Sequence, residues 1–246
     1  MFFEKTRVYN FEGALRGMRN PMNSWERSDS RFYHNCIPYD PYEDDEVKSK
    51  VQIFNNNVDE FDCVAIGEND MSLAQRLIRA GSEHRKFMRQ IFVSVDITAP
   101  IYWWKEFDTY KVGTTANSTS TMHKITESPI TLKCFEIDDY DGSLGLIDDS
   151  IIEVRVENFI NDLEQLRQLY LMTKNKKYWK ELIRWLPESY LQKRTVTLTY
   201  ENIYSIIKQR SNHRLNEWSG IDDDTLVNFI SWAHTLPFAE DFIFIK

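Results

Sequence analysis

IFVSVDI, residues Ile91–Ile97, is the segment that decides the fold, because apolar and polar side chains alternate along a run of strand-forming residues. A helical pattern over 71–80 precedes it, with Asp70 as the predicted N-cap. The aromatic segment 101–110 follows it and predicts a helix that opens at Pro100. A strong strand placed between two helices is typical of a mixed α/β protein.

Patterns further from this strand predict the remaining elements. Residues 28–62 are polar and acidic, with Pro38 and Pro41, and predict an irregular segment. Neither an internal repeat nor a linker is visible, so we expect a single domain over residues 1–246. The other predicted elements are a strand within 1–11, helices over 12–19, 152–170, 178–186, 199–210 and 222–236, and a strand over 194–198.

The composition disfavours several classes of function. A formal net charge of −8 and a pI near 5.2 disfavour binding to nucleic acid polymers, whose phosphates attract basic surfaces. Only 8 glycines are present and neither GxGxxG nor GxxxxGK[ST] occurs, so no glycine-rich phosphate loop is expected. The 5 histidines lack HExxH spacing, and Ile137 stands where a calcium loop needs its first ligand. No metal site is therefore predicted.

The cysteines and the hydropathy pattern indicate the compartment. Cys36, Cys63 and Cys134 are odd in number and form no CxxC pair, which is typical of free thiols in a reducing environment. The opening residues MFFEKTR do not have the pattern of a signal peptide, and no apolar run approaches the ~20 residues of a membrane helix. We therefore expect a cytoplasmic protein without membrane contact.

The segment His84–Arg89, HRKFMR, concentrates positive charge in an otherwise acidic chain. Three cations and a histidine follow the predicted helix end at Gly81 and directly precede the strong strand. One interpretation is an anion-binding segment, because phosphates need paired, charged donors. The alternative is a solvated helix end whose cations complement the helix dipole.

The segment Tyr110–His123 contains a run of small and hydroxylated residues, TTANSTST, at 114–121. Hydroxyl groups and exposed backbone N–H groups can surround a phosphate without glycine repeats, and Lys111 adds a positive charge. The alternative is a flexible polar loop.

Arg210 lies three and four residues beyond Ile207 and Ile206, on the side of its predicted helix that should face inward. A guanidinium brought toward a core needs a partner. That partner is either a ligand or a carboxylate such as Glu217, and the sequence leaves both open.

The order and spacing of these segments resemble the flavin-dependent thymidylate synthases over most of the chain. Phe11–Trp25 is comparable to the family's early segment that ends near Ser-Trp. Leu73–Ala99 is comparable to its helix, Gly-His segment and strand ending in Ile-Thr. The family motif RHRxxSxNExSxR falls on Tyr110–Met122, YKVGTTANSTSTM, and Leu186-Pro187 and the helix-end Arg210 also match in spacing.

Several positions differ from the family's pattern. Ser120 retains the motif residue, whereas Thr199 stands where the family has asparagine on a late strand, and the arginine before Leu-Pro falls next to Arg184. The motif's three arginines and its histidine are replaced, by Tyr110, Val112, Met122 and Lys111 respectively.

The resemblance implies an α/β (α+β) fold, with a central, mostly antiparallel sheet flanked by helices in a single domain. It implies that Arg210 is catalytic and polarises a uracil base. The implied cofactor-binding residues are His84, Arg85, Lys86, Lys111 and Thr199. The implied substrate-binding residues are Arg89, Asn117, Ser118, Ser120 and Arg184.

The implied reaction transfers a one-carbon unit from methylenetetrahydrofolate to C5 of dUMP. FAD reduced by NADPH would supply the hydride, and a homotetramer would build the sites between subunits. The replaced arginines leave two alternatives open: a related modification, such as hydroxymethylation of dUMP or dCMP, and a non-catalytic nucleotide-binding protein that keeps the fold.

Overall fold

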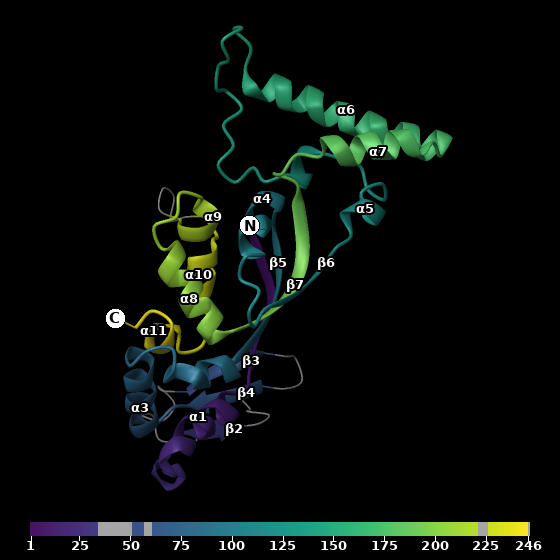
Figure 1. The fold of residues 1–246 in the computed structure, drawn as a ribbon. Coiled ribbons are helices and arrows are strands. Elements are labelled where there is room, and N and C mark those ends of the chain that lie inside the picture. The colour runs from purple at the N-terminus through teal and green to yellow at the C-terminus, as the bar shows by residue number, and fades with distance from the viewer. Residues whose placement is uncertain (34–50, 57–60, 221–225, 246) are drawn as a thin grey trace. The chain divides into compact units, whose positions relative to one another are not determined.

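A computed structural model describes residues 1–33, 51–56, 61–220 and 226–245 (Figure 1). The strands are β1 (Phe2–Tyr9), β2 (Arg31–Tyr33), β3 (Val51–Asn56), β4 (Phe61–Ala65), β5 (Phe92–Pro100), β6 (Thr115–Ser118) and β7 (Leu191–Thr199). The α-helices are α1 (Phe11–Arg19), α3 (Glu68–Arg79), α4 (Ile101–Phe107), α5 (Thr121–Lys124), α6 (Ile152–Thr173), α7 (Lys176–Trp185), α8 (Tyr200–Arg210), α9 (Asn216–Ser219), α10 (Phe229–His234) and α11 (Ala239–Phe242). Short 3-10 helices are η1 (Asn20–Met22), η2 (Trp25–Arg27), η3 (Arg85–Gln90) and η4 (Leu132–Cys134).

The described strands form two sheets. The central, antiparallel sheet has the strand order β1-β5-β7-β6, which confirms the predicted fold class. The smaller sheet has the order β2-β4-β3, and both of its pairings are antiparallel. The predicted strand IFVSVDI becomes β5, between β1 and β7, and Val93, Val95 and Ile97 are at most 1% exposed. Its alternating side chains therefore direct one face of the strand into the core.

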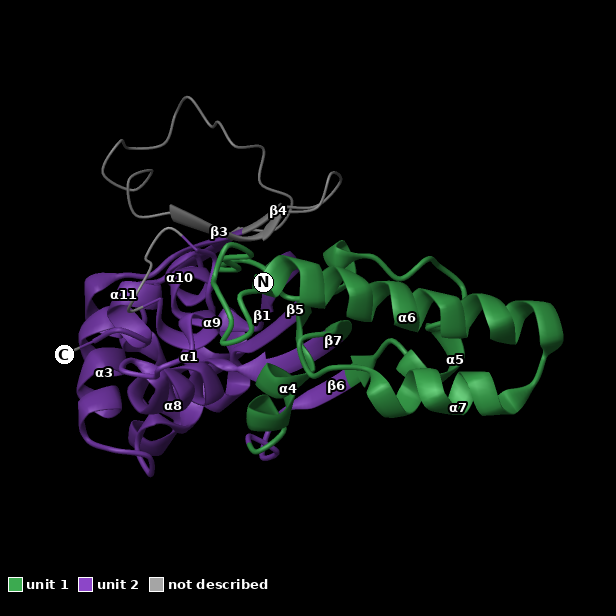
Figure 2. Ribbon diagram, turned by 90° about the horizontal axis from the view of Figure 1, so that it is seen from above, with its two compact units in different colours: residues 1–2, 97–109, 117–194 green, residues 3–96, 110–116, 195–246 purple. Residues whose placement is uncertain are grey.

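The chain forms two compact units (Figure 2). Unit 1 comprises residues 1–2, 97–109 and 117–194, and unit 2 comprises residues 3–96, 110–116 and 195–246. The boundaries fall within strands, so that β5 and β7 each contribute residues to both units. The expectation of a single domain stays a prediction. Among the described residues, no helix has the length and apolar sequence that a membrane span requires.

Aromatic residues from distant parts of the sequence form the core of unit 2. Phe11, the first residue of α1, packs edge-on against Tyr200 and Phe238, with ring centroids 5.6 and 5.7 Å away. The Tyr200 hydroxyl donates to the backbone oxygen of Pro237 at 2.7 Å, and burial raises the pKa of Tyr200 well above its usual value. Such edge-to-face pairs favour a defined geometry, so these rings hold the start of α8 against α1.

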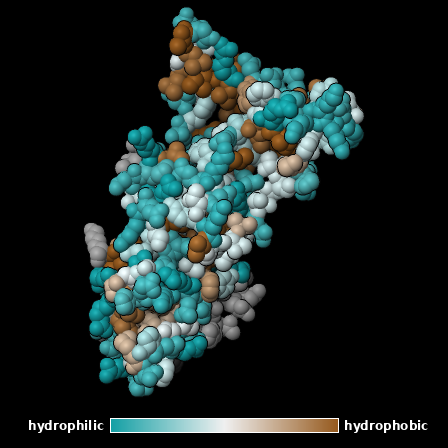
Figure 3. All heavy atoms as spheres, viewed as in Figure 1, coloured by the Kyte–Doolittle hydropathy of each residue, from teal (hydrophilic) through white to brown (hydrophobic). Residues whose placement is uncertain are grey.

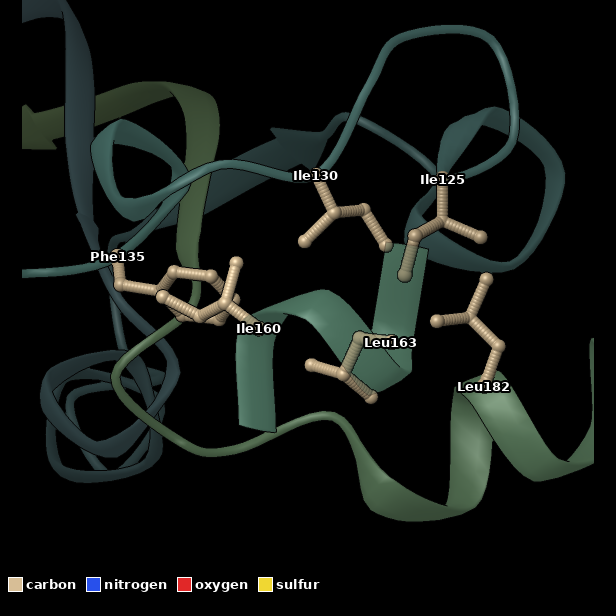
Figure 4. Packing of buried hydrophobic residues seen from close by; sticks show 6 residues of the cluster. All are labelled: Ile125, Ile130, Phe135, Ile160, Leu163 and Leu182. Atoms are coloured by element: carbon tan, nitrogen blue, oxygen red, sulfur yellow. The ribbon is translucent and has the colours of Figure 1, made fainter. Parts of the chain in front are cut away.

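The core of unit 1 joins the helix pair α6–α7 to the segment before α6 (Figure 4). Leu163 on α6 and Leu182 on α7 are 1% and 0% exposed. Figure 4 shows their side chains pointing toward the same apolar cluster. The buried members of the cluster are Ile125, Ile130, Phe135, Ile160, Leu163 and Leu182.

A partly buried ion pair within unit 1 connects residues 126–130 to α6. The Glu164 carboxylate accepts hydrogen bonds from Arg167 Nε at 2.8 Å and Nη2 at 2.7 Å, and from the Ile130 N–H at 2.8 Å. Arg167 Nη1 donates to the Thr126 oxygen at 3.0 Å. The hydrogen bonds from Arg167 are the main cause that lowers the pKa of Glu164 to about 2.

Asp70 does not cap α3, contrary to the prediction, because the helix begins at Glu68. The Asp70 carboxylate instead accepts hydrogen bonds from Arg19 Nε at 2.5 Å and from the hydroxyls of Ser28 and Ser30, both at 2.6 Å. Burial alone would raise the pKa of Asp70, but these bonds together hold it below its usual value. A carboxylate that finds buried partners far away in the sequence is better satisfied there than at a helix end.

Two other segments differ from their predictions. Residues 28–62 contain β2, β3 and the start of β4, whereas the parts of this segment at 34–50 and 57–60 lie outside the described residues. The predicted last helix over 222–236 is described only from 226 onward, and there α10 begins at Phe229. Asn228 and Ser231 form a capping box at that point, which starts a new helix inside the predicted one.

Candidate functional site

The helix α8 begins with a capping box and ends at the predicted catalytic residue. The Thr199 hydroxyl accepts from the Asn202 N–H at 3.3 Å, and Asn202 Oδ1 accepts from the Thr199 N–H at 3.0 Å. Thr199 is only 6% exposed. Its side chain therefore starts the helix, and this geometry does not support the predicted direct contact of Thr199 with a cofactor.

Arg210 lies on the inward side of α8, as its spacing predicts. Ile203 and Ile206 on the same side are fully buried. Arg210 Nε donates to the Tyr110 hydroxyl at 2.8 Å, and the guanidinium carbon lies 5.0 Å from the ring centre of Trp218 and 5.6 Å from that of Tyr110. Aromatic rings and hydroxyl groups orient a guanidinium, so Tyr110 and Trp218 hold the planar donor group of Arg210 in a defined position.

Glu217 is the carboxylate that the sequence offered as an alternative partner for Arg210. Burial is the main cause that raises the pKa of Glu217. A close guanidinium has the opposite effect, because it stabilises the charged form of a carboxyl group. The raised pKa of Glu217 therefore follows from its desolvation.

The start of the segment Tyr110–His123, which we call the hydroxyl-rich segment, is held against α8. Asn202 Nδ2 donates to the Val112 oxygen at 2.7 Å, and the Tyr110 hydroxyl donates to Gln209 Oε1 at 3.2 Å. Gly113 has φ +79° and approaches Asn202 so closely that a Cβ there would lie 3.0 Å from Asn202 Oδ1. This part of the segment is thus a turn anchored at both ends of α8, and the exposed Lys111 lies within it.

A second group of cations lies along one side of α8. We call it the Glu201 cluster, and its members are Arg85, Arg89, Glu201, Tyr204 and Lys208. Arg85 Nε donates to Glu201 Oε1 at 3.1 Å, Arg89 Nε donates to Glu201 Oε2, and Arg89 Nη2 donates to Glu201 Oε1 at 3.3 Å. Hydrogen bonding to Glu201 is the main cause that raises the pKa of Arg89. One carboxylate therefore holds both arginines.

Tyr204 separates two cations of the Glu201 cluster. The Arg85 guanidinium lies 4.6 Å from the centre of the Tyr204 ring, and Lys208 Nζ lies 4.4 Å from it. The two neighbours of Arg85 in the HRKFMR segment are more exposed: His84 faces solvent, and Lys86 pairs with Glu83 at 3.8 Å. The structure thus brings Arg85 and Arg89 together and leaves His84 and Lys86 at the surface.

The Glu201 cluster and Arg210 occupy different sides of α8. Glu201 and Arg210 are nine residues apart on this helix. At roughly 100° and 1.5 Å per residue, nine residues place them on opposite sides and about 14 Å apart along the axis. The structure therefore separates the predicted catalytic arginine from the cationic segment that precedes β5.

Four predicted substrate-binding residues belong to unit 1, and all four are exposed. Asn117 and Ser118 lie on β6, the last strand in the order of the central sheet. Ser120 caps α5 by accepting from the His123 N–H at 3.4 Å. Arg184 lies on α7 and pairs with Glu181. The hydroxyl-rich segment therefore includes a strand and a helix cap.

The sequence did not identify three residues that shape these sites, namely Tyr110, Glu201 and Trp218. The sequence identified Tyr110 only as the start of the segment 110–123 and as a replacement for a motif arginine, and it gave no role to Trp218. The spacing of Arg85 and Arg89, four residues apart, is a signal for a shared anionic partner, but nothing local to it points to Glu201. Within the described part of the chain, no group of three or more His, Cys, Asp or Glu residues is arranged to hold a metal ion.

No family model matches the sequence, and no curated protein matches it either. Solved structures do match. The flavin-dependent thymidylate synthase ThyX from Helicobacter pylori, complexed with FAD and dUMP, aligns with a TM-score of 0.60 at 13% identity, over 99% of this chain and 98% of that chain. A second structure, of thymidylate synthase X from Helicobacter pylori with FAD and dUMP, has the same TM-score and identity. The alignment covers 99% of this chain and 97% of that chain. This likeness shows that the chain has the fold of those structures along nearly its whole length.

Proposed function

We propose that the protein is a divergent enzyme of the flavin-dependent thymidylate synthase type, which transfers a one-carbon unit from methylenetetrahydrofolate to C5 of dUMP with FAD and NADPH. The observation that carries the proposal is the likeness in fold, over 99% of the chain, to structures that contain FAD and dUMP. The retained arginine at the end of α8 supports it, because Arg210 matches the family's spacing and is oriented by two rings.

Arg210 is the residue that we assign to the pyrimidine. Its planar fork of N–H donors matches a carbonyl oxygen of the base, and the positive charge polarises that carbonyl. Tyr110 and Trp218 hold the guanidinium in place before a ligand binds, so little conformational entropy would be lost on binding. In this proposal the exposed residues Asn117, Ser118, Ser120 and Arg184 provide further contacts to the nucleotide.

The positive charge of the Glu201 cluster complements the negative charge of a phosphorylated cofactor. Two guanidinium groups share one carboxylate there, so positive charge remains for the diphosphate of FAD. We assign His84, Lys86 and Lys111 to the same cofactor as exposed polar groups. When bound and reduced by NADPH, the flavin would supply the hydride, and the chain would supply binding and orientation.

The replaced motif arginines favour a second candidate function. Val112 and Met122, which stand at two of these positions, are 88% and 53% exposed, and neither can donate to a phosphate. A protein with fewer phosphate contacts binds its nucleotide more weakly, or binds a different one. The candidates are a related modification of dUMP or dCMP and a nucleotide-binding protein without catalysis.

The test is to incubate the purified protein with FAD, NADPH, methylenetetrahydrofolate and dUMP, and to identify the product by mass spectrometry. We expect a yellow protein with a flavin absorbance band, and a product in which a methyl group replaces the hydrogen at C5, so that it is heavier than dUMP by one CH2 group. A hydroxymethylated product, or turnover of dCMP, would support the related modification. Flavin and nucleotide binding without a product would support the binding protein, and the lack of both would contradict the proposal.

We further propose that the protein works in the cytoplasm as a homotetramer. Exposed apolar side chains on unit 1 give a physical reason for assembly, since Leu144, Leu146 and Ile147 in the loop before α6 are 53%, 40% and 108% exposed. Figure 3 shows hydrophobic residues at the surface in the region of this loop. Light scattering on the FAD-reconstituted protein measures the oligomeric state, and a monomer would contradict this part of the proposal.

A further inference from the structure

The Glu201 cluster unites two arginines that the sequence assigns to different ligands. Arg85 was assigned to the cofactor and Arg89 to the substrate, yet the same carboxylate accepts hydrogen bonds from both. Glu201 is 12% exposed at its side chain, so its two oxygens lie mostly inside the cluster. Two guanidinium groups fixed on one carboxylate cannot serve two separate ligands independently.

We propose that Arg85 and Arg89 form one binding site for a single phosphate group, and that Glu201 is the positioning residue of this site. The inference rests on the proposed function in one respect: the phosphate belongs to a nucleotide, either FAD or dUMP. It goes beyond that function because it assigns both arginines to one ligand and gives Glu201 a role.

The charge of the cluster favours an anion. Arg85, Arg89 and Lys208 carry three positive charges, and Glu201 carries one negative charge. Glu83 also acts on Arg89, but its negative charge is matched by its partner Lys86. Salt and water screen the exposed part of this excess, but Arg85 is only 16% exposed and is screened less. A phosphate group would neutralise the remaining charge, and charge-assisted hydrogen bonds to phosphate are among the stronger ones in proteins.

The donors of the two arginines are arranged for a shared ligand. Glu201 uses Nε of both residues, and Arg89 Nη2 also donates to the Ser82 oxygen at 3.4 Å. Among the described residues, Nη1 and Nη2 of Arg85 and Nη1 of Arg89 make no hydrogen bond. Tyr204 fixes the position of the Arg85 guanidinium, while Arg89 is 50% exposed. A ligand can therefore reach an anchored arginine next to a more accessible one.

A purely structural role is the competing explanation, in which Glu201 only fastens η3 to α8. The two explanations differ in what Glu201→Gln does to anion binding. If the carboxylate is only a structural anion, its removal leaves more positive charge and phosphate binds more tightly. If the carboxylate positions the arginines, the variant binds phosphate more weakly even though it gains positive charge, because the two guanidinium groups lose their common anchor.

The experiment titrates FAD, dUMP and inorganic pyrophosphate into the wild-type protein and into Arg85→Gln, Arg89→Gln and Glu201→Gln, by calorimetry. We expect each arginine variant to weaken the same one of the two nucleotides at least tenfold, and to weaken pyrophosphate as well. Glu201→Gln should weaken that same nucleotide at least threefold. Melting curves of each variant identify any loss of folding, and only variants that retain the wild-type melting transition are compared.

The matched control is Arg155→Gln, which removes another arginine that pairs with a carboxylate and is 59% exposed at its side chain, in unit 1. It should leave all three affinities unchanged. If Arg85→Gln weakens one nucleotide and Arg89→Gln the other, the single site is wrong. If Glu201→Gln binds more tightly or equally, the positioning role is wrong.

The failure of the proposed function is distinguishable from the failure of this inference. If the wild-type protein binds neither FAD nor dUMP, the proposed function fails, and the pyrophosphate titration alone tests the site. Pyrophosphate binding that both arginine variants lose would then support the site. Pyrophosphate binding that they retain, or its absence in the wild type, would overturn it. If FAD or dUMP binds and no cluster variant changes the affinity, only the phosphate site is overturned.

Discussion

Arg167 in unit 1 and Arg210 in unit 2 both lie on helices and turn inward, but their surroundings differ. Arg167 is held by the Glu164 carboxylate and by a backbone oxygen, so its charge is cancelled and its donors are used within the fold. Arg210 contacts the rings of Trp218 and Tyr110, which orient its guanidinium. The comparison teaches that two inward-turned arginines can be positioned by different kinds of contact, a carboxylate in one case and aromatic rings in the other.

The largest effect that we expect comes from removing the ring beneath Arg210. Trp218 is fully buried and packs against Phe229 with ring centroids 5.5 Å apart. Trp218→Ala should lower the free energy of unfolding by about 3–5 kcal/mol, because a large buried side chain leaves a cavity. Denaturant unfolding measures this loss.

The control for this prediction is Trp185→Ala on α7. Trp185 is 58% exposed, so its removal should change the free energy of unfolding by no more than about 0.5 kcal/mol. Equal effects of the two substitutions would mean that the support of Arg210 is not part of the core.

The next largest effect concerns the arginine that a carboxylate holds. Glu164→Gln should lower the free energy of unfolding by about 2–3 kcal/mol at neutral pH, because Arg167 then keeps a buried charge without its counter-ion. The pKa of Glu164 is lowered to about 2, so its contribution is present above the ordinary pKa of a glutamate and is lost as the pH falls toward 2. The difference between wild type and variant should therefore shrink over this acidic range.

Glu181→Gln is the matched control, since Glu181 forms the same i,i+3 pair with Arg184 on an exposed face of α7. Exposed pairs of this kind contribute less than about 0.5 kcal/mol. A stability difference for Glu164→Gln that is the same at neutral pH and at pH near 2 would show that the ion pair is not the source of the effect.

A smaller effect, on binding, is expected for Arg210→Lys. A lysine keeps the charge but not the planar fork, so dUMP should bind at least tenfold more weakly, about 1.4 kcal/mol, at nearly unchanged melting temperature. Arg214→Lys, an exposed arginine four residues later, is the control and should bind dUMP as the wild type does. If Arg210→Lys binds dUMP with unchanged affinity but has a markedly lower melting temperature, Arg210 has a structural role and does not bind the nucleotide.

The smallest effect is expected for Tyr110→Phe, which keeps the ring over Arg210 and removes the hydroxyl that accepts from Arg210 Nε at 2.8 Å. The substitution also removes the hydrogen bond that this hydroxyl donates to Gln209, but only the bond to Arg210 orients the guanidinium, so dUMP binding should weaken by about 0.5–1 kcal/mol. Tyr9→Phe, an exposed tyrosine on β1, serves as the control in the same titration. A loss as large as that of Arg210→Lys would mean that the hydroxyl itself contacts the nucleotide.

The sequence by itself determined the elements whose patterns are strong over a few turns or a few strand residues. The alternation in IFVSVDI identified β5, and the spacing of Ile203, Ile206 and Ile207 identified α8 and the inward side on which Arg210 lies. Order and spacing also led to the fold, although only 13% of the residues match the solved structures. These features are local, or follow from the order of local features, because backbone propensity and side-chain periodicity act over short ranges.

Only the tertiary structure decided which partner each charged group has. Arg210 and Tyr110 are 100 residues apart, Arg89 and Glu201 are 112 apart, and Asp70 finds Arg19 across 51 residues instead of capping its own helix. Charge pairing depends on which distant segments pack together, and the apolar side chains around the charges determine that packing. No local pattern contains this information, so the sequence could predict Arg85 and Arg89 as cations but could not predict that one carboxylate holds them both.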